Sequence, residues 1–149
     1  IKKIRDEVKE IIDKANVTLP RGARLEISHH YGLDKFYKYG ITMINIINKS
    51  YCKKLIIMLP GQKHPAQFHQ VKEESFFILY GTVNLILNKK LHILKPGDLK
   101  TIRKKEVHEF FSKKGAIIEE LSTEHVKSDS FYLDKKIGNN KNRKSFIYL

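Results

Sequence analysis

Hydrophobic residues recur at two different spacings along the chain, and the change between them predicts two kinds of secondary structure. In residues 1–15 they fall at helical spacing, which predicts an amphipathic helix that ends near Asn16 and Pro20. From Leu25 onward the apolar runs are short and separated by turn residues, which is typical of β-strands. We expect strands at residues 39–47, 54–59, 67–69, 75–80, 82–87, 91–94, 99–102, 108–111, 116–122 and 145–148.

Many short strands at this spacing predict an all-β sandwich or barrel. The 149 residues suffice for one domain with a proper core. We therefore expect an N-terminal helix and linker in residues 1–20, followed by a single β domain in residues 21–149. Because the chain begins with Ile1 rather than Met, we expect that it was cut from a longer protein, with the helix as a connector.

Charge and cysteine content narrow the function classes. The formal net charge is +13, but the excess is mostly lysine pairs scattered at expected turns, without an arginine cluster or an aromatic-interleaved basic stripe. We therefore expect no nucleic-acid partner. The apolar runs, such as residues 55–59, are too short to span a bilayer, so no membrane partner is expected. Cys52 is the single cysteine, which excludes an internal disulfide and favours a reducing, cytoplasmic location.

The most informative stretch is GQKHPAQFHQVKEESFFILYG, in which Gln67, His69 and Glu74 lie between Gly61 and Gly81. Gln67 and His69 are two residues apart, so on a strand they point to the same side. Four residues then leave room for a turn before a second strand begins at Glu74. An amide, an imidazole and a carboxylate therefore converge across a hairpin, and this is how a β scaffold builds a metal site.

A second stretch, LKPGDLKTIRKKEVHEFF, places His108 near the start of a later strand. Together the two stretches resemble the two motifs of the cupin superfamily. The first motif is matched at both glycines, at His69 and at Glu74, while Gln67 replaces the family's first histidine. In the second motif only His108 is kept, and Arg103, Lys105 and Ser112 stand where the family has Pro, Gly and Asn.

The resemblance implies an all-β cupin fold, a double-stranded β-helix or jelly-roll-like barrel, that follows the N-terminal amphipathic helix. It also implies a divalent metal inside the barrel, bound by His69, Glu74, His108 and Gln67. Zinc, manganese or iron would suit these ligands, and the Gln67 amide would bind more weakly than an imidazole. His64 is an alternative ligand. The competing interpretation is a barrel that kept the hairpin but lost the metal.

Three longer runs, residues 39–81, KPGD at 95–98 and IIEELSTEHVKSDSFY at 117–132, carry a narrower resemblance. They resemble cupins related to D-lyxose isomerase, and most of all the C-terminal cupin domain of some N-acetylneuraminate (sialic acid) synthases. This resemblance implies a ketose–aldose isomerase-like function on a small-molecule carbohydrate, in sialic acid, nonulosonic acid or related carbohydrate metabolism. Such an isomerase needs a base besides the metal, and Lys54 and Glu120 are our candidates. Glu119 and Asp129 are further candidates, and strand parity alone does not decide which glutamate faces inward.

Two other function classes stay open on the sequence. The first is a non-catalytic, sugar-binding or regulatory cupin module covalently linked to an upstream synthase domain. The second, which nothing outside the metal ligands favours, is an iron-dependent dioxygenase. The run from His29 to Tyr31 could line a sugar pocket or cover a dimer interface. Because exposed edge strands are a liability, we expect a homodimer that pairs through them.

Overall fold

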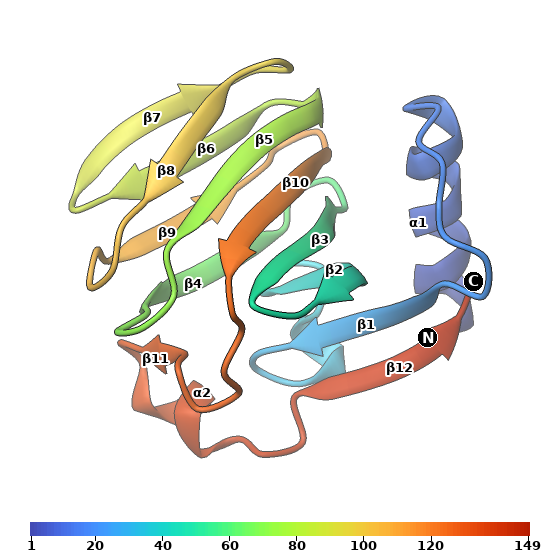
Figure 1. Ribbon diagram of the computed structural model, residues 1–149. Helices are drawn as coiled ribbons and strands as arrows, with labels where there is room; N and C mark the ends of the chain where they lie inside the picture. Colours follow the sequence, from blue (N-terminus) through green and yellow to red (C-terminus); the bar gives the residue numbers. More distant parts are fainter.

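Two antiparallel β-sheets face each other and enclose the interior of a barrel, and one helix packs on the outside (Figure 1). The structure is a computed structural model that describes residues 1–149. Its elements in chain order are α1 (Lys2–Lys14), β1 (Arg24–His29), η1 (Leu33–Lys35), β2 (Gly40–Asn48), β3 (Tyr51–Met58), β4 (Lys63–Phe68), β5 (Glu74–Gly81), β6 (Val83–Leu87), β7 (Lys90–Leu94), β8 (Leu99–Ile102), β9 (His108–Phe111), β10 (Ala116–Thr123), β11 (Phe131–Tyr132), α2 (Lys135–Asn139) and β12 (Lys144–Tyr148).

The order of strands places the two ends of the chain beside each other. The larger sheet has the order β12-β1-β2-β3-β10-β5-β8, and the smaller sheet has the order β11-β4-β9-β6-β7. Strand β12 pairs with β1, so the C-terminal strand closes the same edge from which the N-terminal strand starts. This architecture confirms the predicted all-β class with a leading helix. No helix is long and apolar enough to cross a membrane.

Most predicted strands are confirmed within three residues, but four elements were not predicted: β1, η1, β11 and α2. The signal for β1 was present, since Leu25 and Ile27 alternate with polar residues. Strand β4 begins at Lys63, four residues earlier than predicted, because Pro65 made this stretch resemble a loop. The sheet tolerates this proline through a register shift between His64 and Gln67.

An outer core joins α1 to the larger sheet, on the side that faces away from the smaller sheet. The helix buries one apolar stripe, as its 3.6-residue periodicity predicted. The strands that form this core contribute alternate residues to it, because alternate side chains of a strand point to the same face. The buried members are Ile4, Val8, Ile11, Ile12, Ala23, Leu25, Ile27, Phe36, Ile44, Leu55, Ile57, Leu59 and Ile117.

A second, inner core fills the closed end of the barrel between the two sheets. It uses the opposite parity of the same strands, so β3 contributes Leu55 and Ile57 outward but Ile56 and Met58 inward. The apolar run at residues 55–59 is therefore a strand buried on both faces. The buried members of the inner core are Ile41, Ile56, Met58, Phe76, Ile78, Val83, Leu85, Leu87, Leu94, Ile102, Phe110, Ala116 and Ile118.

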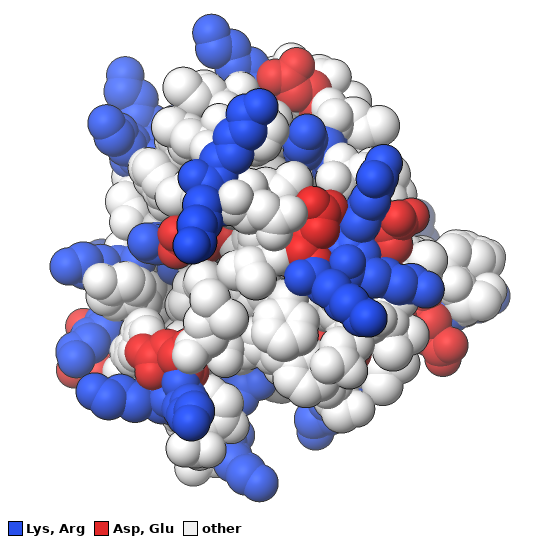
Figure 2. Space-filling view, turned by 90° about the vertical axis from the view of Figure 1, so that its left-hand side faces the viewer, with Lys and Arg blue, Asp and Glu red and all other residues white.

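The surface carries its positive charge in a dispersed form. Figure 2 shows Lys and Arg side chains spread over one face of the molecule, with Asp and Glu side chains among them. Several lysines are neutralised locally, as in the pairs Lys53–Glu119 at 3.1 Å and Lys63–Glu109 at 3.2 Å. The lysines of this face are therefore spread out, as their scattered positions in the sequence indicated.

Gly81 provides a test of how the barrel depends on one close approach between chain segments. Its φ is +74°, and a Cβ atom would lie 2.1 Å from the carbonyl oxygen of Gly115. Gly61 has a similar φ of +85°, but its nearest atom would be 4.0 Å away. We expect Gly61→Ala to cost about 1–2 kcal/mol of unfolding free energy from the left-handed backbone alone. Gly81→Ala should cost clearly more.

Denaturant unfolding measures the loss of unfolding free energy in both variants, provided that their m-values are equal. Gly138→Ala is the matched control, because this helical glycine has no atom within 4 Å of a built Cβ. It should be neutral or slightly stabilising, since alanine favours a helix. Equal losses for Gly81→Ala and Gly61→Ala would show that the close approach to Gly115 does not matter.

Candidate metal centre

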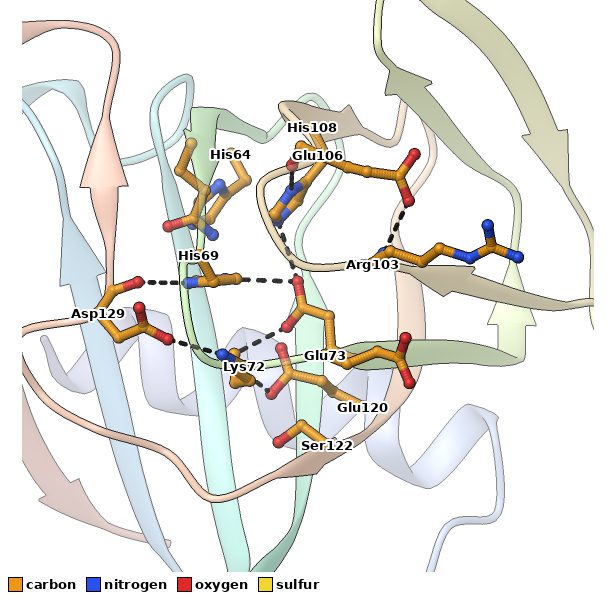
Figure 3. Close-up of polar contacts among 12 residues, drawn as sticks. His64, His69, Lys72, Glu73, Arg103, Glu106, His108, Glu120, Ser122 and Asp129 are labelled. Atoms are coloured by element: carbon orange, nitrogen blue, oxygen red, sulfur yellow. Dashed lines mark hydrogen bonds and ion pairs between the residues drawn. The ribbon is translucent and has the colours of Figure 1, made fainter.

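Three buried side chains meet at the open end of the barrel, where the apolar inner core stops. His69 follows the last residue of β4, Glu74 is the first residue of β5, and His108 is the first residue of β9. Their exposed fractions are 4%, 2% and 0%, and their nitrogen and oxygen ligand atoms all lie within 4.8 Å of one another. Figure 3 shows the two imidazoles pointing toward the same carboxylate. Three different strand ends therefore build one polar cluster.

Backbone carbonyls fix the orientation of both imidazoles. His69 donates from Nδ1 to the carbonyl oxygen of Asp129 at 2.8 Å, and His108 donates from Nδ1 to the carbonyl oxygen of Glu106 at 3.0 Å. A carbonyl oxygen only accepts, so each Nδ1 carries the proton and each Nε2 has a free lone pair. The Nε2 atoms lie 3.5 Å and 3.0 Å from Oε1 of Glu74.

This arrangement requires a positive charge among the three groups. Both Nε2 atoms and both Glu74 oxygens lack a hydrogen-bond partner of good geometry. Two lone pairs and a carboxylate repel one another in a buried site unless a proton or a metal ion lies among them. Burial alone would lower the pKa of His108, but Glu74 raises it. The site therefore favours a positive charge on His108 when no metal ion is bound. The donor set of two imidazoles and a carboxylate fits a divalent metal ion.

Lys72 is a functional residue that the sequence analysis missed. Its ammonium lies 3.2 Å from one oxygen of Glu74 and 3.8 Å from Glu120, although the residue is only 4% exposed. Burial alone would lower the pKa of Lys72, but the two carboxylates raise it above its usual value. Burial alone would likewise raise the pKa of Glu74, yet Lys72 and the imidazoles hold it well below its usual range. A lysine two residues before the expected ligand Glu74 was the available signal.

Asp129, a candidate base in the sequence, has a structural role here. Its carboxylate accepts hydrogen bonds from the backbone N–H groups of Gln70, Val71 and Lys72, at distances from 2.9 to 3.2 Å. Burial would raise the pKa of Asp129, but these N–H groups lower it. The same residue offers its carbonyl to His69, so Asp129 ties the turn between β4 and β5 to the ligand.

Gln67 lies beside this cluster and lines the same cavity as His69, as their shared strand side predicted. Its amide nitrogen is 3.5 Å from Nε2 of His64, whose Nδ1 donates to the carbonyl oxygen of Pro65. Nε2 of His64 is therefore an acceptor, which turns the Gln67 nitrogen toward it. His64 is not part of the converging group and stacks on Phe110 at 4.9 Å between ring centroids.

The structure decides which glutamate of β10 faces inward. Glu119 has the parity of Ile117, points outward and pairs with Lys53 at 3.1 Å. Glu120 has the parity of Ile118, is 6% exposed and lines the cavity. Burial and the neighbouring Glu74 raise the pKa of Glu120 to about 7.

Lys54, the other catalytic candidate, lies directly opposite Glu120 on the neighbouring strand β3. Burial lowers the pKa of its ammonium, because Glu120 only partly offsets the loss of water. Lys54 lines the same cavity of about 60 Å³ as Gln67, His69 and Glu120. The structure therefore brings both catalytic candidates next to the metal ligands.

The aromatic and histidine-rich approach before β2 divides between two roles. His30 lines the cavity together with Tyr132 and His125. Burial lowers the pKa of His30 to about 4, so this side chain is neutral. Tyr31 instead donates to the Asp134 carboxylate outside the cavity. His125 lies on the loop after β10 and reaches the cavity wall.

Comparisons with known proteins agree with this fold. The model of the cupin domain family matches residues 54–119. A D-lyxose ketol-isomerase of Thermofilum sp. (strain ex4484_79) is 23% identical over 168 residues, with 92% of this chain and 93% of that protein covered.

Solved structures of L-ribose isomerases share the fold. The ligand-free enzyme of Cellulomonas parahominis has a TM-score of 0.76 at 13% identity, with 93% of each chain covered. The enzyme of Acinetobacter sp. DL28 in complex with L-ribose has a TM-score of 0.74 at 12% identity, covering 93% of this chain and 94% of that chain. Residues 54–119 are therefore similar to the cupin domain family, and the two facing sheets and the histidine–glutamate–histidine cluster accord with this similarity.

Proposed function

We propose that this protein is a metal-dependent isomerase that interconverts an aldose and a ketose. The observation that carries the proposal is the position of Glu120, whose pKa is raised to about 7. Glu120 lines the same cavity as His69 and neighbours Glu74, and both of these residues belong to the converging group with His108. An isomerase of this kind needs a divalent ion and a proton-transferring group within reach of one carbon skeleton. The similarity to a D-lyxose ketol-isomerase supports the same reaction class.

His69, Glu74 and His108 would hold the metal, with the amide oxygen of Gln67 as a fourth ligand. Two imidazoles and two oxygen donors suit manganese, iron or zinc. When bound, the ion would polarise a sugar carbonyl and its neighbouring hydroxyl. The hydrogen bonds from both imidazoles to backbone carbonyls orient their Nε2 atoms for metal binding, as hydrogen bonds to metal-binding histidines usually do.

Glu120 would move the proton between the two carbons. A general base works best when its pKa lies near the operating pH, and burial with Glu74 brings Glu120 to this range. Lys72 at 3.8 Å and Lys54 across the strand pair act in the opposite direction and favour the carboxylate. We assign Lys54 to the catalytic group as the charged neighbour that helps Glu120 to lose its proton.

A second candidate function is a non-catalytic sugar-binding module of a nonulosonic-acid synthase or a related biosynthetic enzyme. Gln67 favours this candidate, because an amide oxygen is a weaker metal ligand than the histidine it replaces. A binding module would take up sialic acid precursors or nucleotide sugars in calorimetry without exchanging any sugar proton. Proton exchange therefore separates the two candidates.

Metal binding is the first expected outcome. The purified protein, loaded with Mn²⁺ or Zn²⁺ and dialysed, should carry about one ion per chain by elemental analysis. At one hundred times Kd the ion should add about 2.7 kcal/mol of stability. His69→Ala should lose both the ion and this increment.

His92→Ala is the matched control for that experiment, because His92 lies on β7 away from the converging group. It should bind metal like the unchanged protein. A protein that binds no metal but is destabilised more by His69→Ala than by His92→Ala would favour an imidazolium–carboxylate pair in place of a metal centre.

The neighbouring glutamates of β10 test the proton transfer. Glu120→Gln should lower turnover about 10²- to 10⁴-fold, the usual contribution of a general base, while metal content is kept. Glu119→Gln, which changes the outward partner of Lys53, should leave turnover unchanged. The measurement is exchange of the aldose C2 hydrogen with solvent deuterium, followed by proton NMR with a panel of pentoses and hexoses. Equal turnover in both variants would contradict the role of Glu120.

We also propose a homodimer that pairs through the edge strands β7 and β8. These strands end their respective sheets and expose Leu91 at 51%, Ile93 at 58% and Leu99 at 60%. Sedimentation should give a dimer, and Ile93→Lys should give a monomer. Leu133→Lys, at an equally exposed leucine away from both edges, should stay dimeric. A monomeric unchanged chain at high concentration would contradict the proposal.

A further inference from the structure

The cavity beside the metal ligands is too small to hold a whole sugar. Its volume is about 60 Å³, room for roughly two water molecules at about 30 Å³ each. Pockets for small ligands usually have volumes of about 300–1,000 Å³. A substrate that reaches the ligands must therefore extend out of this inner cavity.

A second cavity of about 460 Å³ lies next to the inner cavity, and we call it the vestibule. The two spaces share four wall residues, and the remaining vestibule wall comes from the segment before β1, from β1 and β2, and from β12. The shared residues are Met43, Lys54, His125 and Lys144. A ligand with one end at the metal ligands would place its other end in the vestibule.

The vestibule wall is strongly cationic. Arg21, Arg24, Lys54 and Lys144 line it, and Glu26 is its single carboxylate. Lys144 pairs with Glu26 at 2.9 Å, whereas the structure contains no ion pair for Arg21, Arg24 or Lys54. His125 adds no charge at neutral pH, since burial lowers its pKa to about 4. Arg21 and Arg24 therefore face the vestibule without an anionic partner from the protein, and Lys54, opposite Glu120, is a third cation in its wall.

The fold holds these cations in place. Leu25 and Ile27 of β1 are buried in the outer core, so Arg24 and Glu26 project from the other face of the sheet. The guanidinium of Arg24 lies over the ring of Phe146 on the paired strand β12, 4.4 Å from the ring centroid. Arg24 is exposed, and this contact with Phe146 orients its guanidinium at the vestibule wall, where its donors are accessible to a ligand.

We propose that the vestibule binds an anionic group, a phosphate or a carboxylate, carried by the sugar at the end remote from its carbonyl. The preferred substrate is then an aldose phosphate or a sugar acid rather than a neutral sugar. Guanidinium and ammonium groups are the side chains that recognise both anions, and Arg24 can do so with two donors. The placement of the carbonyl end at the metal ligands rests on the function proposed above.

Matched sugar pairs test this inference on the metal-loaded protein. D-ribose 5-phosphate is compared with D-ribose, and D-glucuronate with D-glucose, by calorimetric binding at two ionic strengths and by C2 exchange. We expect at least one anionic sugar to bind about 10- to 100-fold more tightly than its neutral partner, the range of a charge-assisted contact. The advantage should shrink at high salt. The pair that shows it separates a phosphate from a carboxylate specificity.

Arg24→Gln should remove most of that advantage and leave the binding of the neutral sugar unchanged. Arg103→Gln is the control, because it removes the same charge from an exposed arginine outside the vestibule. Nitrogen-15 NMR of the arginine side chains supplies a readout independent of turnover, since the Nε–H signal of Arg24 should shift with D-ribose 5-phosphate or inorganic phosphate but not with D-ribose.

The outcomes separate this inference from the proposed function. Anion binding that depends on Arg24, without exchange in any sugar, would contradict the isomerase and support the vestibule. Neutral sugars that bind and exchange as well as anionic ones, with Arg24→Gln equal to Arg103→Gln, would overturn the vestibule and leave the isomerase standing. An unshifted Arg24 signal with every anion would also overturn it.

Discussion

A buried carboxylate that faces two imidazole lone pairs is the constraint on which this structure depends. Glu74 is 2% exposed, and the nearest His108 nitrogen lies 3.0 Å from its oxygen. No arrangement of neutral groups makes such a contact favourable, so the site must hold a proton or a metal ion. The surrounding chain serves this need, because the carbonyls of Asp129 and Glu106 fix the imidazoles and Lys72 neutralises the far side of the carboxylate.

The two cores explain how a small chain keeps such a polar cluster in place. The outer core binds α1 to the larger sheet, and the inner core fills the closed end of the barrel. The strands between the outer and inner cores are buried on both faces, so close-packed side chains support the larger sheet from both sides. The polar cluster lies where the inner core ends, so its ligands are carried by strand ends that both sheets support.

The electrostatics of the open end change with distance from the metal ligands. Near the ligands, carboxylates and cations alternate, as in the chain from Glu74 through Lys72 to Glu120. Farther out, the vestibule keeps cations that have no acidic partner. Under the proposals above, the inner region would serve proton transfer at neutral pH and the outer region would recognise a negative group, with Lys54 in the wall of both cavities.

The sequence by itself determined the fold class, most of the strands and the convergence of His69 and Glu74, because short-range spacing fixes strand parity and hairpin geometry. His108 joined this set through the resemblance to the second cupin motif, not through spacing. The sequence could not decide between Glu119 and Glu120, since both parities of β10 are apolar when a strand is buried on two sides. The sequence analysis also missed Lys72, because the role of Lys72 depends on its ion pair with Glu120, which lies on a strand far away along the chain. Only the tertiary structure brings Arg24, Lys54 and Lys144 to one chamber, because contacts between distant segments leave no periodic trace in the sequence.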